Sequence, residues 1–261
     1  MQKILFLLLF VSTLNSFAQY DDKWKEVYKY ELDGKIKSAQ EEVEEIYKKA
    51  KRKKEEVQII KCFFYLSKFE QVFDEKAQTT IIHNIQKEIN EAKPVSKALL
   101  HYIYINILEE YYNRNRYTIK KRTNLENQKN TDFLTWTEDD FKAQIEKNYN
   151  QLLLNENDLR SVNLDKFKDI FDISPSVDDK NYSIYEFLSQ KSCNYYKSRI
   201  VSWRLKKSTD FENDIKIFYT NPNSFVNFDS KKLEDENLRK LISIFQKNEK
   251  YCRGLCGSIY R

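Results

Sequence analysis

Glycine and proline are scarce in this chain, and their scarcity is what most restricts its fold. Only three glycines and three prolines occur among 261 residues. Hairpin-rich β proteins need glycine at tight turns, and doubly wound α/β proteins need it at phosphate-binding loops. The chain is therefore predicted to be all-α. Its 41% of apolar residues, with 15% aromatic residues, is enough to form a helical core.

Apolar residues recur every three or four positions along most of the chain, which is the spacing of one helix face. They predict a short helix near Trp24 and, after Gly34, a longer one from Ile36 to Ala50. A more apolar helix is expected from Val57 to about Phe73. Two further helices are separated by Pro94. The apolar positions of these two helices are Ala77, Ile81, Ile82, Ile85, Ile89, Leu99, Leu100, Ile103, Ile107, Leu108 and Tyr111.

The segment DFLTWTEDDFKAQIEKNYNQLLLN, residues 132–155, joins an isolated tryptophan to an acidic, periodic helix. Thr137 lies three residues before Asp140, which predicts a capping box at the start of this helix. Glu138, Asp139 and Asp140 lie where the helix dipole favours negative charge. Helix initiation explains these acids, so we interpret them as structural rather than as an acid–base pair. The expected buried face contains Phe141, Ile145, Tyr149 and Leu152.

Two later helices complete the predicted architecture. One opens at Ser183 and Glu186 with the same capping signature, and the last carries apolar residues from Leu238 to Phe245. Polar segments at 120–130 and 172–181 are interpreted as loops within one array. We expect antiparallel helical hairpins in a solenoid-like (TPR/HEAT-like) array, with units recurring at roughly 40 residues.

The predicted domain boundaries enclose nearly the whole chain. A single helical-repeat-like domain is expected over residues 19–250. The ending YCRGLCGSIYR departs from the helical pattern, so residues 251–261 are predicted to form an irregular tail. Cys252 and Cys256 in this tail could close a small disulfide loop in an oxidising compartment.

The first eighteen residues, MQKILFLLLFVSTLNSFA, have the form of a secretory signal peptide. Lys3 precedes an apolar run from Ile4 to Val11, and Ser16 and Ala18 are small residues at positions −3 and −1. Cleavage is predicted after Ala18. The mature chain, from Gln19, is expected in the periplasm, the cell envelope or outside the cell. No later segment approaches the ~18 to 20 apolar residues of a spanning helix, so no membrane span is predicted.

Charge gives little reason to expect a nucleic-acid partner. The formal net charge of the full chain is +5, spread among many lysines and glutamates. The most basic run, KKAKRKK at residues 48–54, follows EEVEE on the same helix. Glu44 and Lys48, and likewise Glu45 and Lys49, therefore have the spacing of favourable i,i+4 pairs. We interpret the run as a solvated helix end and predict no nucleic-acid binding.

Cysteine and histidine do not form a recognisable metal or catalytic pattern. Cys62 lies in an apolar helix and is interpreted as a core residue. A zinc site would need a second close pair of ligands besides Cys252 and Cys256, and His83 and His101 have no ligand spacing. The sequence contains no GxSxG, Walker or HExxH motif. We therefore predict no catalytic residue, no metal and no cofactor.

Several segments, taken in their order, carry a family resemblance. They are Trp24 followed by ELDGKIKSAQEEVEEIYKKAK, then QIIKCFFYL, KALLHYIYINILEEYYNRNRYTIKKRT, TDFLTWT and YSIYEFLSQKSCNYY. From about Tyr20 to Phe245 the chain resembles the N-terminal helical region of a bacterial family of very large alpha-2-macroglobulin-like proteins. Such proteins resemble macroglobulin protease traps, in which a protease cuts a bait segment and the molecule changes shape. In many members a Cys-Gln thioester then captures the protease.

The resemblance implies an exported, non-enzymatic scaffold within a protease-inhibitor (defence) protein. Its implied partners are downstream macroglobulin domains or a protease, and the chain would then be a fragment of a longer protein. The sequence has no thioester motif, and no functional residue carries over, because the matching positions all belong to the helical scaffold. The alternative is a secreted helical enzyme or polymer-binding module that uses carboxylates such as Glu138 and Asp139 with exposed aromatic residues. A deep pocket with carboxylates of raised pKa would favour this alternative, and a carboxylate-poor concave face would favour the scaffold.

Overall fold

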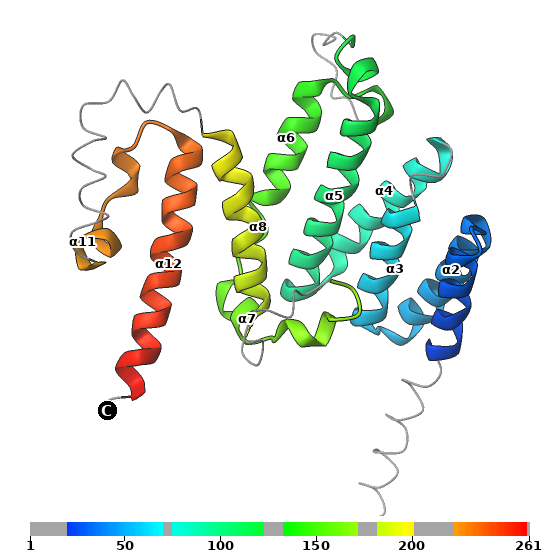
Figure 1. The fold of residues 1–261 in the computed structure, drawn as a ribbon, viewed down its shortest axis with the longest axis horizontal. Coiled ribbons are helices and arrows are strands. Elements are labelled where there is room, and N and C mark those ends of the chain that lie inside the picture. The colour runs from blue at the N-terminus through cyan, green and yellow to red at the C-terminus, as the bar shows by residue number, and fades with distance from the viewer. Residues whose placement is uncertain (1–19, 70–74, 123–132, 172–181, 201–221, 260–261) are drawn as a thin grey trace, which may run out of the picture. The chain divides into compact units, whose positions relative to one another are not determined.

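All regular structure in the described part of the chain is helical, which confirms the prediction of an all-α protein (Figure 1). An isolated β-bridge between Asn163 and Ser183 is the single extended contact there. The predicted leader at 1–18, the loop at 172–181 and most of the loop at 120–130 lie outside the described residues. The computed structural model describes residues 20–69, 75–122, 133–171, 182–200 and 222–259.

Two compact units divide the described helices, where the sequence predicted a single domain over residues 19–250. The first unit ends at Ile184 and the second begins at Tyr185. This boundary falls at the start of the helix α8 (Ile184–Arg199). The polar segment at 172–181, which contains Pro175 and which we interpret as a loop within one array, ends just before this boundary.

Helices of the first unit pack on helices that are adjacent or next but one in the chain. α2 packs against α3, α3 and α4 against α5, and α5 against α6. Two-residue turns join α2 to α3 and α4 to α5, which makes each pair an antiparallel hairpin. A solenoid-like array requires such sequential packing, and the solenoid-like arrangement stays a prediction. The elements are a helix at residues 20–32, α2 (Ile36–Lys53), α3 (Glu56–Phe69), α4 (Glu75–Glu91), α5 (Pro94–Ile119), η2 (Phe133–Thr135), α6 (Glu138–Tyr149), α7 (Glu156–Arg160) and η3 (Leu164–Phe167).

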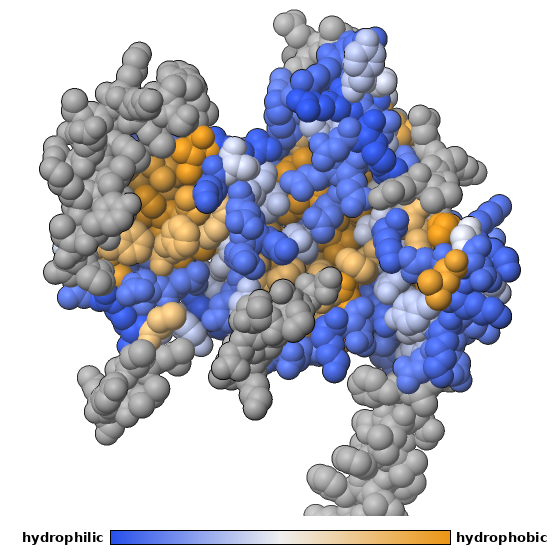
Figure 2. All heavy atoms as spheres, viewed as in Figure 1, coloured by the Kyte–Doolittle hydropathy of each residue, from blue (hydrophilic) through white to orange (hydrophobic). Residues whose placement is uncertain are grey.

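The apolar faces predicted from residue spacing form the core of this unit. Ala39, Val43, Ile46 and Ala50, the recurring apolar positions of α2, are fully buried, and the apolar positions predicted for α5 are buried as well. Figure 2 shows the complementary surface: exposed faces of these helices are mostly hydrophilic, and apolar side chains lie between them. Burial of a continuous apolar stripe by adjacent helices is the main force that stabilises such packing.

Trp24 fixes the first helix against α3. Its indole N–H donates to the side-chain oxygen of Gln58 at 2.8 Å, and its ring lies 5.0 Å from the ring of Tyr65. The buried Lys61 ammonium lies 4.4 Å from the centre of the same indole ring. The turn that follows needs Gly34, whose φ of 70° is accessible to glycine at little cost.

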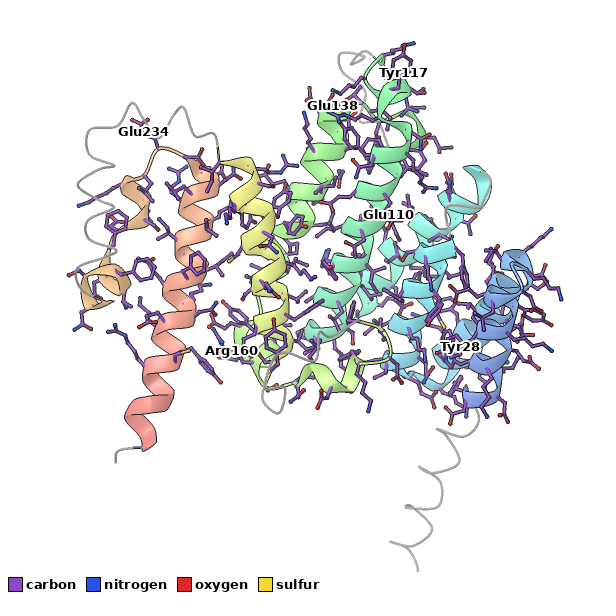
Figure 3. The ribbon with its side chains drawn as sticks, in the orientation of Figure 1. Tyr28, Glu110, Tyr117, Glu138, Arg160 and Glu234 are labelled. Carbon is purple, nitrogen blue, oxygen red and sulfur yellow. The ribbon has the colours of Figure 1, made fainter. Side chains whose placement is uncertain are left out.

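The predicted capping box opens α6. The Thr137 hydroxyl accepts from the Asp140 N–H at 3.3 Å, and the Asp140 carboxylate accepts from the Thr137 N–H at 2.9 Å. Glu138 follows in the first turn (Figure 3). Trp136 is only 5% exposed and packs edge-on against Phe141. The predicted buried face is confirmed, with Phe141, Ile145, Tyr149 and Leu152 all buried.

The second unit contains most of α8 together with α11 (Pro222–Asn227), η5 (Ser230–Lys232) and α12 (Glu236–Ile259). α12 packs against α11 and η5. The Gln246 side-chain amide donates to the carbonyl oxygens of Phe225 and Phe228, both at 2.8 Å, and so satisfies the end of α11. Phe245, on the predicted apolar stripe of α12, is 48% exposed.

Residues 251–259 are helical, which corrects the prediction of an irregular tail over 251–261. Two glycines in this segment suggested a break, but a glycine inside a helix costs only about 1 kcal/mol relative to alanine. The i,i+4 ion pair between Glu249 and Arg253, at 2.8 Å, joins two turns at this point. α12 therefore continues to Ile259.

We expect Thr137→Ala to lower the free energy of unfolding by about 1 kcal/mol, because the first-turn N–H groups of α6 lose their acceptor. Urea unfolding followed by circular dichroism measures the change. Thr118→Ala, at an exposed position of α5, is the matched control and should stay within about 0.5 kcal/mol of the parent chain. Equal stabilities of the two variants would contradict the capping role.

Candidate functional site

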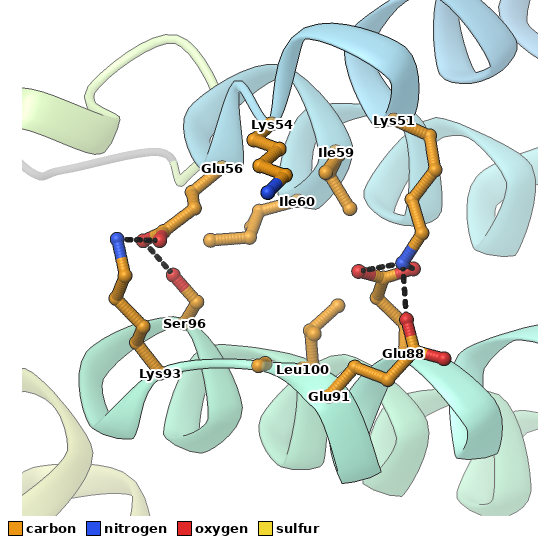
Figure 4. A pocket seen from close by; sticks show the side chains of 11 residues that line it. Lys51, Lys54, Glu56, Ile59, Ile60, Glu88, Glu91, Lys93, Ser96 and Leu100 are labelled. Carbon is orange, nitrogen blue, oxygen red and sulfur yellow. Dashed lines mark hydrogen bonds and ion pairs between the residues drawn. The ribbon is translucent and has the colours of Figure 1, made fainter.

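A cavity of about 330 Å³ lies between the α2–α3 turn and the α4–α5 turn of the first unit (Figure 4). Because both turns belong to antiparallel hairpins, two helices end and two helices begin around it, and their dipoles largely offset one another. Side chains therefore determine its charge. It is lined by Lys51, Lys54, Glu56, Ile59, Ile60, Glu88, Glu91, Ala92, Lys93, Ser96 and Leu100.

One wall of the cavity is an ion-pair network around Lys51. The Lys51 ammonium donates to the two carboxylate oxygens of Glu88 at 2.6 and 2.7 Å and to Glu91 at 2.8 Å. The Tyr47 hydroxyl donates to Glu88 at 3.1 Å. Burial lowers the pKa of Lys51, but the two glutamates outweigh it and raise the pKa above its ordinary value. This network joins the first hairpin to the second.

The opposite wall is a second network around Glu56. Its carboxylate accepts from the Lys93 ammonium at 2.6 Å and from the Ser96 hydroxyl at 2.8 Å. Burial raises the pKa of Glu56, but these two hydrogen bonds outweigh it and leave the pKa below its ordinary value. Lys51 likewise lowers the pKa of Glu91. Both carboxylates are therefore ionised and paired at neutral pH.

Lys54 differs from the other two lysines of the cavity. Its backbone has a φ of 58°, in the left-handed region that glycine usually occupies at a helix C-terminus. The side chain forms no ion pair or hydrogen bond with any described residue, and Figure 4 shows its ammonium group over Ile60. The apolar floor below consists of Ile59, Ile60 and Leu100, which are all buried.

The chemistry available here is binding rather than acid–base catalysis. The cavity contains three lysines and three glutamates, and every glutamate accepts from a lysine. A catalytic carboxylic acid needs a pKa raised towards neutral pH, whereas the pKa values of Glu56 and Glu91 are lowered. One unpaired ammonium above an apolar floor remains to contact a ligand.

The basic run at 48–54, predicted to be a solvated helix end, has different partners from those expected. Lys48 pairs with Glu45 at 2.8 Å instead of with Glu44, and Lys49 lies 4.8 Å from the centre of the Tyr20 ring. Lys51 and Lys54 of this run line the cavity. Sequence reasoning missed their role because Lys51 and Glu88 are 37 residues apart, so no local spacing links them.

No cysteine or histidine is among the residues that line the cavity. Cys62 is buried in α3, as predicted, and burial raises the pKa of its thiol. His101 lies with Nδ1 2.6 Å from the Asn148 side-chain oxygen, and burial lowers its pKa. The described residues contain no group of three or more His, Cys, Asp or Glu that could hold a metal ion. Cys252 is exposed in α12, and the side chain of Cys256 lies outside the described part, so their disulfide stays a prediction.

Comparisons with protein-family models, with curated proteins and with solved structures found no match for this chain. The resemblance to macroglobulin-like proteins therefore rests on the segments quoted from the sequence. None of the helices in the described ranges is both long enough and apolar enough to cross a membrane.

Lys51→Met should lower the free energy of unfolding by about 2 kcal/mol, because it leaves the buried Glu88 carboxylate without its cation. The expected loss is smaller than the ~3–5 kcal/mol of a fully buried pair, since the Lys51 side chain is 36% exposed. Lys48→Met, which removes an exposed pair, is the control and should cause no measurable change. Urea unfolding of both variants gives the comparison, and equal losses would contradict the bridging role of Lys51.

The lowered pKa of Glu56 predicts a stability contribution that is present at neutral pH and lost in acid. A carboxylate with a lowered pKa stabilises the fold above its unfolded pKa, and the contribution disappears as pH falls through the folded pKa. The difference in unfolding free energy between the parent chain and Glu56→Gln should therefore be constant above about pH 5 and shrink towards pH 3. Urea titrations across this range measure it. Glu41→Gln, on the exposed face of α2, controls for the loss of one negative charge, and a Glu56→Gln difference independent of pH would contradict the prediction.

Proposed function

We propose that the chain is an exported, non-enzymatic helical module that binds protein partners. The pairing of the cavity carboxylates is the observation that supports this best. Glu56 and Glu91 have lowered pKa values, and Glu88 accepts from Lys51 and Tyr47. An acid–base enzyme is expected to keep at least one carboxyl group unpaired and poised near neutral pH.

The alternative function, a helical enzyme or polymer-binding module, has less support. Its proposed carboxylate Glu138 lies 2.7 Å from the Lys142 ammonium. Hydrogen bonds from Lys142 and Tyr112 lower the Glu138 pKa. Its proposed aromatic platform is also weakened, because Trp24 and Trp136 are 3% and 5% exposed. Rings buried to this extent cannot stack on a polymer chain.

The protease-defence role rests on the sequence resemblance. The segment QIIKCFFYL belongs to α3, most of KALLHYIYINILEEYYNRNRYTIKKRT to α5, and nearly all of SIYEFLSQKSCNYY to α8. These positions are largely buried or paired within helices, as a scaffold requires. Export rests on the leader pattern at residues 1–18 and on the predicted cleavage after Ala18. We therefore propose downstream macroglobulin domains or a protease as the partners.

A binding experiment tests this proposal. The chain from Gln19 to Arg261 is mixed with serine, cysteine and metallo-endoproteases whose active sites are chemically blocked, and complexes are detected by size-exclusion chromatography with light scattering. We expect a complex with at least one protease class. The corresponding active protease should keep its rate towards a small peptide substrate, because a non-enzymatic scaffold contacts the protease away from its catalytic groups.

Two results would contradict the proposal. The absence of a complex with every protease class would contradict direct protease binding and, of the two proposed partners, would leave downstream macroglobulin domains. Release of soluble fragments from peptidoglycan or another polysaccharide by the chain, abolished in Glu138→Gln, would favour the enzymatic alternative. The heat-unfolded chain controls for non-specific adsorption in both assays.

A further inference from the structure

We propose that the cavity between the two helix turns binds a small apolar monocarboxylate, with Lys54 holding its carboxylate. This inference goes beyond the role of a protein-binding scaffold and does not depend on it. The ligand chemistry follows from three properties of the cavity: the one unpaired charge that faces it, the apolar floor and the size.

Charge pairing selects an anion over a cation. Lys51 and Lys93 already contact glutamates at 2.6 to 2.8 Å, whereas the Lys54 side chain has no such contact with a described residue. An incoming ammonium group would meet Glu56, Glu88 and Glu91, all of which already accept from lysines. An incoming carboxylate instead meets an available donor, and such charge-assisted hydrogen bonds are the stronger kind.

The floor and the volume select an apolar body of modest size. Ile59, Ile60 and Leu100, the apolar floor, line the cavity together with Lys54 (Figure 4). A volume of about 330 Å³ is near the lower end of small-molecule sites in proteins. It suits an aliphatic chain of about eight carbons, or the last residue of a peptide, since each would cover the floor and place one carboxylate at the rim.

The two ion-pair networks keep this cavity open before a ligand arrives. Lys51 joins α2 to α4, and Glu56 joins α3 to the start of α5 through Lys93 and Ser96. Walls held in this way do not have to be ordered by the ligand, so less binding free energy is lost. Lys54 thus completes a largely pre-formed site.

Two natural sources share this chemistry: a medium-chain fatty acid, and the free C-terminus of a peptide that ends in an apolar residue. Isothermal titration calorimetry of the chain from Gln19 uses four probes to distinguish them. These are octanoate, octanamide, an N-acetylated tripeptide ending in leucine, and the same tripeptide with an amidated end. Octanamide and the amidated peptide keep the apolar body and lack the negative charge.

We expect at least one of the two carboxylates to bind saturably, about tenfold or more tightly than its amide. Lys54→Met nearly keeps the length of the side chain and removes its charge. It should lower the affinity for that carboxylate by a similar factor. Lys53→Met, one residue earlier and outside the cavity lining, is the matched control and should bind like the parent chain. Ala92→Phe should abolish binding, because the ring fills the cavity at a half-buried position between helices.

The carboxylate that binds with the higher affinity shows whether the natural ligand is a fatty acid or a peptide C-terminus. Failure of both carboxylates to bind the folded parent chain would overturn the proposal. Equal affinities for a carboxylate and its amide, or equal weakening by Lys54→Met and Lys53→Met, would do the same. The circular dichroism spectrum and unfolding midpoint of every variant establish that lost binding is not lost folding. Protease binding by the chain is measured separately, so failure here leaves the scaffold proposal unaffected.

Discussion

The contact between Lys51 and Glu88 connects the first helical hairpin to the second, and the geometry of the cavity depends on it. Glu88 is almost fully buried, so its charge is tolerable only because Lys51 and Tyr47 donate to it. Apolar packing by itself would allow the hairpins to slide along one another, since the hydrophobic effect has little directionality. A buried carboxylate with fixed donors specifies one register, and the walls of the cavity follow from that register.

Much of the fold could be predicted from local sequence patterns. The spacing of apolar residues located the helices from α2 to α6, and Thr137 and Asp140 identified a helix start by their own geometry. These signals are local because the residues involved lie within two helical turns of one another. The prediction for the end of α12 was wrong because it relied on local preference alone. The glycines favoured a break at residues 251–261, but the cost of a helical glycine is small enough to be offset by other contacts.

The candidate site could not be predicted in this way. Its walls come from residues far apart in sequence, such as Lys51 with Glu88 and Glu56 with Lys93. Their pairing depends on the order in which the hairpins pack, which apolar periodicity does not specify. The basic run at 48–54 was interpreted from its nearest acids. Only its neighbours in space determine that Lys51 is paired, whereas Lys54 has no partner in the part of the chain that the structure describes. The division into two units was hidden likewise, because it falls at the start of the helix α8.

The left-handed backbone conformation of Lys54 gives selection for fold stability and selection for ligand binding opposite preferences at this position. Glycine would relieve the steric cost of its positive φ, so selection for stability alone should replace this lysine. Selection for a charge above the cavity should retain it. A library randomised at this one position and sorted separately for protease resistance and for retention of a fluorescent carboxylate would therefore enrich different residues. The residue that evolution keeps at this turn in any relative reports which of the two requirements has been stronger.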